Sequence, residues 1–216
     1  GKVPPYVLIG KAGIRSIADL KGKRVSVGAP SDPTTLYFER MATANGLHQG
    51  DYQVLSAGFA AARYAALKAG VAEAAMLLPP LNFLAEKAGF VTLGLAADYL
   101  KDLPFTGMAV YKPWTTAHVA LVKRLLAATD QSMAWLLDTA HRQEAIDLLV
   151  QVVHADAANS AASYDLLRRI GYFEATSKVS HRKLQNLIDT ERKLGQVGPS
   201  LTVDRLIMPG LTELVD

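Results

Sequence analysis

The stretch that decides the fold runs from residue 24 to residue 35 and reads RVSVGAPSDPTT. Its first part, Arg24–Gly28, is a short apolar run typical of a buried strand. Asp32 is a good N-cap, so a helix is predicted over Pro33–Asn45, with proline at its first position and Gly46 ending it. A strand that leads through a loop into a helix presents backbone N–H groups at one point, which suits the capture of a small ligand.

Outward from this stretch, short apolar runs alternate with helical patterns up to residue 104. Further strands are predicted at residues 52–56, 74–78 and 90–94, and further helices at residues 59–69 and 81–88. This βαβαβαβ order predicts a parallel sheet with right-handed crossovers. Ligands of such sheets bind beyond the carboxyl ends of the strands, which are here the loops 28–35, 56–59 and 78–82.

The pattern changes after Pro104. One more strand is predicted at residues 105–111, helices over residues 116–194, and a tail at 201–216 with a last helical turn near Leu211. Trp114 and Trp135 are expected to anchor the core of these helices. The strand at 105–111 needs a sheet to join, and the available partner is Tyr6–Ile9, so we expect the second unit to be incomplete on its N-terminal side.

Composition limits the possible functions. The 216 residues are 50% apolar and 20% charged, and the net charge of +3 is spread along the chain, so no nucleic-acid partner is expected. The absence of cysteine excludes disulfides, thiolate metal sites and cysteine nucleophiles. The five histidines show no metal-ligand spacing, and neither a metal nor a cofactor is expected. Apolar runs end well before the roughly 20 residues of a membrane-spanning helix, and no signal peptide is visible.

Several phrases along the chain resemble those of one family. Residues 17–28, IADLKGKRVSVG, are similar to the entry into the second lobe of solute-binding proteins of ABC importers. Further matches are ALKAGVAEAA at 66–75, LLPP at 77–80, GQV at 195–197 and LTVDRL at 201–206. The ordered set resembles the group whose members bind aliphatic sulfonates, taurine, nitrate and thiamine-pyrimidine precursors.

This resemblance implies the type II periplasmic-binding-protein fold, in which two α/β lobes joined by crossing segments close on a ligand. The expected fold class is therefore α/β, with one complete βα lobe and a helix-rich partial second lobe. Residues 14–104 resemble lobe two, and residues 105–216 resemble the return strand and C-terminal helices of lobe one. Residues 1–13 resemble the last hinge segment of lobe one's first half, so the preceding part of lobe one is expected to be missing from this sequence.

The first loop supplies the polar candidates for ligand binding. The hydroxyl groups of Ser31, Thr34 and Thr35 lie at a predicted helix N-terminus, where they can hold the polar head of a ligand. The alternative is that Ser31 or Asp32 simply caps the helix. The carboxylate of Asp32 would repel a simple anion at this helix end. That favours a neutral or amine-bearing ligand, such as a heteroaromatic compound.

The other loops and the hinge supply the remaining candidates. Gly58 and Phe59 lie in the second loop, where Phe59 either stacks on a ligand ring or packs against the protein. Pro79 and Asn82 lie in the third loop, and the amide of Asn82 can both donate and accept. Thr106 lies at the expected hinge.

The resemblance implies the substrate-binding component of an ABC importer, which binds a small organic solute reversibly and delivers it to a membrane permease. Such a protein is expected to be monomeric and either periplasmic or lipid-anchored outside the cytoplasm. The alternatives are the ligand-sensing domain of a LysR-type regulator and a homologue of the enzyme for thiamine-pyrimidine synthesis. That enzyme's family relies on a cysteine-rich motif, which this chain lacks, and there is no Gly-x-Ser-x-Gly motif, so no catalytic residue is assigned.

Overall fold

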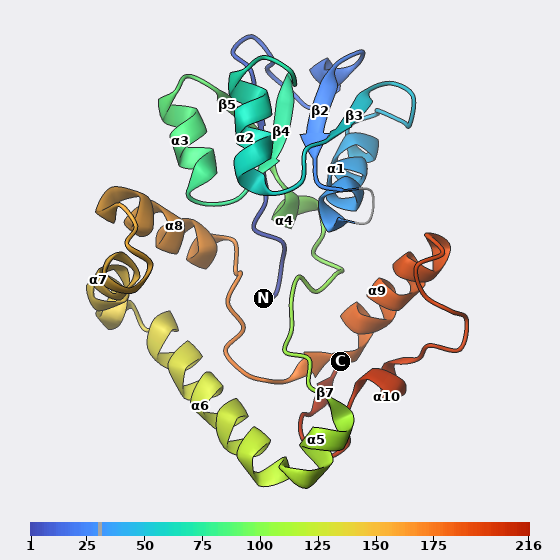
Figure 1. The fold of residues 1–216 in the computed structure, drawn as a ribbon, viewed down its shortest axis with the longest axis vertical. Coiled ribbons are helices and arrows are strands. Elements are labelled where there is room, and N and C mark those ends of the chain that lie inside the picture. The colour runs from blue at the N-terminus through green and yellow to red at the C-terminus, as the bar shows by residue number, and fades with distance from the viewer. Residues whose placement is uncertain (30–31) are drawn as a thin grey trace.

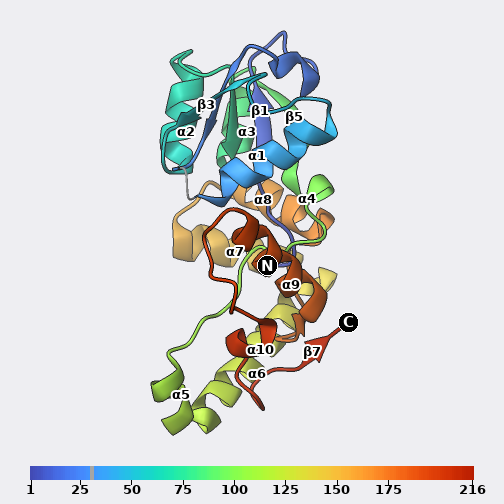
Figure 2. The same cartoon turned by 90° about the vertical axis from the view of Figure 1, so that its right-hand side faces the viewer.

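A sheet covered by helices forms one part of the molecule, and an array of helices forms the other (Figure 1). The computed structural model describes residues 1–29 and 32–216, and within these residues the main sheet has five strands in the order β3-β2-β4-β1-β5. The strands are β1 (Val7–Gly10), β2 (Arg24–Val27), β3 (Gln53–Ser56), β4 (Ala74–Leu77) and β5 (Val91–Leu95). Figure 2 shows the sheet part and the helical part stacked along the long axis of the molecule.

The strand at the N-terminus corrects the predicted all-parallel sheet. β2 pairs in parallel with β3 and with β4, as the alternating pattern predicts. β1 lies between β4 and β5 and is antiparallel to both, with Leu8 opposite Met76 on one side and Gly94 on the other. Residues 6–9 were predicted to pair with a strand at 105–111. They instead complete this sheet, because Leu8 and Ile9 become fully buried there.

Apolar side chains fill a core on each face of the sheet. Alternate residues of β1 point to opposite faces, so Leu8 belongs to one core, and Val7 and Ile9 belong to the other. The first core is covered by α1 (Pro33–Ala44) and α4 (Ala96–Tyr99), and the second by α2 (Ala60–Lys68) and α3 (Leu81–Lys87). β4 is uniformly apolar and buried, as predicted for a strand covered on both sides.

The helices of this part begin and end where local chemistry places them. Asp32 caps α1 through a hydrogen bond from the Thr34 backbone N–H, and Pro33 takes the first helical position. Gly46 and Gly70 follow the ends of α1 and α2 with φ angles of 79° and 74°, which favour glycine. A short 3-10 helix, η1 (Ala18–Leu20), precedes β2.

The second part is an array of helices, and a small core joins the helices over residues 119–137, 142–153 and 157–169. The elements are α5 (Lys112–Ala117), α6 (Val119–Leu137), η2 (Thr139–His141), α7 (Arg142–Val153), α8 (Ala157–Arg169), α9 (His181–Lys193) and α10 (Val203–Leu206). Trp135 packs in this core beside Ala145, Ile146 and Tyr164, as predicted. Trp114 does not, because its side chain is 45% exposed and stacks on His118 at the surface. No helix among the described residues is both long and apolar enough to span a bilayer.

Two predicted features of this part are wrong. Within the described chain, residues 105–111 pair with no strand, and Met108, Val110 and Tyr111 remain exposed. The predicted partner of this segment, residues 6–9, pairs within the main sheet instead, so the extended segment has no described strand beside it. In the tail, the last helix is α10, and Leu211 lies in a hydrogen-bonded turn before β7 (Leu214–Val215), which pairs with β6 (Val179–Ser180).

Candidate functional site

The predicted ligand loops meet at one edge of the sheet. The carboxyl ends of β2, β3 and β4 point toward the helical part (Figure 1). Because β1 is antiparallel, its amino end lies at this same edge and brings Tyr6 there. The backbone N–H of Ala57 donates to the carbonyl of Val27 at 3.0 Å, so the loop after β3 begins directly beside the last residue of β2.

In the first loop, the polar groups mostly bind one another. Asp32 Oδ1 accepts from the backbone N–H of Thr34 at 2.8 Å, and the buried Thr34 hydroxyl accepts from the backbone N–H of Gly28 at 2.8 Å. These bonds fix the start of α1 and turn the carboxylate of Asp32 back into the helix end. Thr35 Oγ1 is buried without a hydrogen-bond partner among the described residues. The predicted contact Ser31 lies outside the described residues.

The second loop carries an exposed aromatic ring on a fixed backbone. Gly58 has a φ angle of 67°, which favours glycine, and Phe59 directly precedes α2. Phe59 is 89% exposed, so its ring is open to contact from outside.

A buried arginine behind this loop was missed from the sequence. Arg63 of α2 is 2% exposed, its Nε donates to the carbonyl of Met76 at 2.7 Å, and its Nη1 donates to the carbonyl of Gly58 at 2.5 Å. Its guanidinium also lies over the ring of Tyr6, 5.7 Å from the centroid. One pattern could have revealed this, since Arg63 lies four residues before the buried Leu67 and therefore on the same face of the helix.

Two tyrosines and an asparagine extend the site inward. Tyr6 and Tyr37 are buried with their ring centroids 5.7 Å apart, and burial raises the pKa of both hydroxyls, so both remain protonated donors at neutral pH. Of the third loop, Pro79 is half-buried, and Asn82 is 2% exposed with an Oδ1 that has no hydrogen-bond partner among the described residues. An unpaired buried amide oxygen is available to a donor from a ligand or water.

Thr106 lies where extended segments cross between the two parts of the molecule. Its carbonyl accepts from the Gly1 amino group at 3.0 Å, and the Gly1 carbonyl accepts from the backbone N–H of Phe105 at 3.1 Å. The backbone N–H of Lys2 donates to the carbonyl of Tyr172 at 2.7 Å. The ring of Phe105 lies 6.1 Å from that of Tyr6, so this crossing adjoins the edge that carries the loops.

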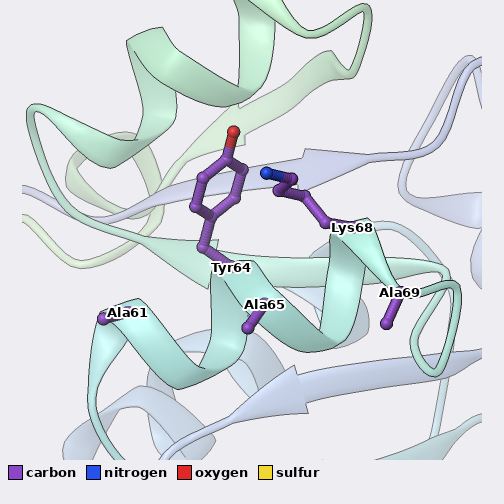
Figure 3. A pocket seen from close by; sticks show the side chains of 5 residues that line it. All are labelled: Ala61, Tyr64, Ala65, Lys68 and Ala69. Carbon is purple, nitrogen blue, oxygen red and sulfur yellow. The ribbon is translucent and has the colours of Figure 1, made fainter.

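The hollow drawn in Figure 3 lies on the outer side of α2 and includes none of the predicted ligand residues. It is lined by Ala61, Tyr64, Ala65, Lys68 and Ala69. Lys68 reaches over the ring of Tyr64, with Nζ 5.5 Å from the centroid. Across the part of the chain that the structure describes, no group of three or more His, Cys, Asp or Glu side chains is arranged to hold a metal ion.

The sequence matches a known family over most of its sheet part and into the helices. A family model described as "NMT1/THI5 like" matches residues 5–145, which is more than half of the chain. The chain belongs to the NMT1/THI5-like family. This NMT1/THI5-like chain has no significant match among curated proteins.

Solved structures share the fold at low sequence identity. One is the alkanesulfonate-binding protein SsuA from Xanthomonas axonopodis pv. citri bound to MOPS, with 20% identity and a TM-score of 0.70, covering 96% of this chain and 72% of that one. Another is the ligand-binding component of an ABC-type import system from Staphylococcus aureus, with 14% identity and a TM-score of 0.76, covering 97% and 70%. A third is a mutant of the desulfurization enzyme DszB in complex with biphenyl-2-sulfinic acid, with 14% identity and a TM-score of 0.69, covering 97% and 75%.

These likenesses confirm the predicted fold class, a mixed α/β fold of the type II periplasmic-binding-protein kind. Several of the neighbours are named as binding proteins for sulfonates or as the ligand-binding component of an import system, whereas DszB shows that an enzyme also uses this fold.

Proposed function

We propose that this NMT1/THI5-like chain is the substrate-binding component of an ABC importer, which binds a small organic solute reversibly between its sheet part and its helical part. The observation that carries the proposal is the meeting of the loops after β2, β3 and β4 at the edge that faces the helices (Figure 1). Solute-binding proteins with this fold support the same assignment.

The proposal assigns a role to each segment of the chain. Residues 14–104 form the lobe that carries the ligand loops, together with β1 from the segment 1–13, and residues 105–216 contribute to the opposing lobe. The crossing at Gly1, Thr106 and Tyr172 is the hinge. The protein acts as a monomer outside the cytoplasm, in the periplasm or attached to the membrane, and passes its solute to a permease.

The site residues of the proposal come from the loops after β2, β3 and β4 and from the helix starts that follow them. Thr35 and Asn82 offer polar atoms that are buried and unpaired within the described chain, and Phe59 offers an exposed ring. Asp32 and Thr34 shape the first loop through their mutual hydrogen bonds, while Gly58 and Pro79 shape the other two. A ligand is therefore held by a few polar groups on an otherwise apolar surface.

A catalytic role is the second candidate, because the enzyme DszB shares the fold. The present chain contains no cysteine, so any covalent chemistry here would need a serine, threonine or other nucleophile. The structure does not pair such a residue with a histidine base among its described hydrogen bonds, which favours binding over catalysis.

Titration by NMR tests the proposal. MOPS and biphenyl-2-sulfinate are added separately to the ¹⁵N-labelled chain, with sodium sulfate as the ionic-strength control. We expect saturable shift changes for at least one organic solute, confined to residues 28–35, 57–59 and 78–82. Changes spread over the surface, or equal to those with sulfate, would contradict a specific site. Chemical conversion of a solute during the titration would favour the enzyme.

A further inference from the structure

Arg63 holds together two strands that do not pair with each other. β3 and β4 lie on opposite sides of β2, and Arg63 bonds to the carbonyl of Gly58, just after β3, and to the carbonyl of Met76, within β4. A side chain with several donors in a rigid planar group is suited to such a bridge. We infer that Arg63 is a positioning residue, which fixes the loop Ala57–Phe59 so that the Phe59 ring faces a solute containing a planar ring.

The charge of Arg63 is buried and bonds to groups of the protein itself. The side chain is 2% exposed, and no carboxylate of the described residues lies within ion-pair distance of it. A buried charge is unfavourable unless hydrogen bonds and dipoles compensate it. Here two backbone carbonyls and the face of the Tyr6 ring do so, which fixes the guanidinium in one place.

What Arg63 positions is an exposed aromatic ring that stacks on no other ring among the described residues. Among the large apolar side chains that the structure describes, Phe59 is the most exposed, at 89%. Its backbone is held by hydrogen bonds, because the carbonyl of Gly58 accepts from the Arg63 side chain and the carbonyl of Phe59 accepts from the backbone N–H groups of Ala62 and Arg63. A rigidly held, exposed ring at a ligand edge can stack on a planar ring, and such stacking is more favourable than contact with a saturated chain.

The same arginine is linked to the hinge through packed aromatic rings. The ring of Tyr6 lies against Arg63 on one side and 6.1 Å from Phe105 on the other, and Phe105 lies 5.9 Å from Tyr172. The loop that carries Phe59 is thus connected by packed side chains to the segments that cross between the two parts. A movement of the loop on ligand binding would be transmitted through these side chains to the crossing.

Hydrogen exchange tests the positioning role without any ligand. Arg63→Met removes the donors at similar length, Arg63→Lys keeps the charge with a single donor group, and Lys68→Met is the control on the exposed side of the same helix (Figure 3). In Arg63→Met we expect amide exchange in residues 56–60 to accelerate about tenfold or more, with less change in Arg63→Lys and none in Lys68→Met. Uniform acceleration along the chain, or none in this loop, would overturn the inference.

A double-mutant cycle tests the effect on binding, and this part rests on the proposed function. Affinities for biphenyl-2-sulfinate and MOPS are measured in the wild type, Phe59→Ala, Arg63→Lys and the double variant. We expect Phe59→Ala to weaken biphenyl-2-sulfinate by about fivefold and MOPS by less. The two substitutions should be non-additive, because Arg63 acts through the loop.

The outcomes separate the two proposals. Additive losses, or equal losses for both solutes, would overturn the role of Arg63 and Phe59 while leaving the solute-binding function in place. If neither solute binds the wild type, the proposed function and the planar-ring ligand both fail, and the exchange experiment alone decides whether Arg63 positions the loop.

Discussion

Arg24 and Glu73 form a two-point ion pair at the start of neighbouring strands. Nη2 of Arg24 lies 2.9 Å from Glu73 Oε1, and Nε lies 3.2 Å from Oε2. The backbone N–H of Arg24 also donates to this carboxylate at 2.9 Å, and Lys11 Nζ lies 3.4 Å from it. These contacts fix the start of β2 against the turn before β4, and they lower the pKa of Glu73 from 4.5 to about 2.

The ion pair predicts an acid-sensitive contribution to stability. Because the pKa of Glu73 is lower in the folded state, the contribution is fully present above the ordinary value of 4.5 and is lost as the pH falls toward about 2. Glu73→Gln should lower the free energy of unfolding at neutral pH by about 1 kcal/mol, a modest amount because Arg24 is solvent-exposed. Urea denaturation at a series of pH values measures the difference between the two proteins, which should vanish in acid.

Asp204→Asn is the matched control for this experiment. Asp204 is exposed and has no ion-pair partner in the described part of the chain. A pH dependence of the same size in this variant would mean that general charge repulsion, not the Arg24–Glu73 pair, is responsible.

Removing the cap of α1 should destabilise the first ligand loop. Asp32→Ala loses the bond to the Thr34 N–H and should cost about 1 kcal/mol, whereas Asp32→Asn should cost little because asparagine caps equally well. Chemical denaturation measures both. If amine-bearing solutes bind at this helix end, Asp32→Ala should also weaken them, and unchanged or tighter binding would reject that preference.

Position 28 must be glycine because the side chain of Asp32 lies close to its backbone. A Cβ at this position would lie 2.2 Å from Cγ of Asp32, so Gly28→Ala would displace the capping side chain. We expect a loss of roughly 1–3 kcal/mol in the free energy of unfolding. Gly107→Ala, at a position where nothing lies within 4 Å of the added atom, should be nearly neutral by the same measurement. Equal effects would show that chain flexibility, and not the contact with Asp32, decides the outcome.

The two tryptophans should differ in their contribution to stability. Trp135 packs beside Ile146 and Tyr164 and stacks on His141, so Trp135→Ala should lower the free energy of unfolding by about 2 kcal/mol. Trp114 is 45% exposed, and Trp114→Ala should cost under about 1 kcal/mol. Thermal unfolding ranks the two variants, and the opposite order would contradict the placement of Trp114 at the surface.

Local chemistry made much of the sheet part predictable. The cap at Asp32, the glycines after α1 and α2, and the apolar run of β4 each depend on residues within a few positions of one another. The loops at the strand ends follow from the alternation of strands and helices, and the family resemblance was confirmed over residues 5–145. These features need no knowledge of distant contacts.

Tertiary structure alone decided the rest. β1 could pair near residue 105 or within the main sheet, and it joined the sheet because Leu8 and Ile9 bury fully between β4 and β5. That choice left residues 105–111 without a strand partner. Likewise, an arginine in an alanine-rich helix is ordinarily a surface residue, and only the carbonyls of Gly58 and Met76, brought together from strands that do not pair, provide the acceptors that allow Arg63 to be buried.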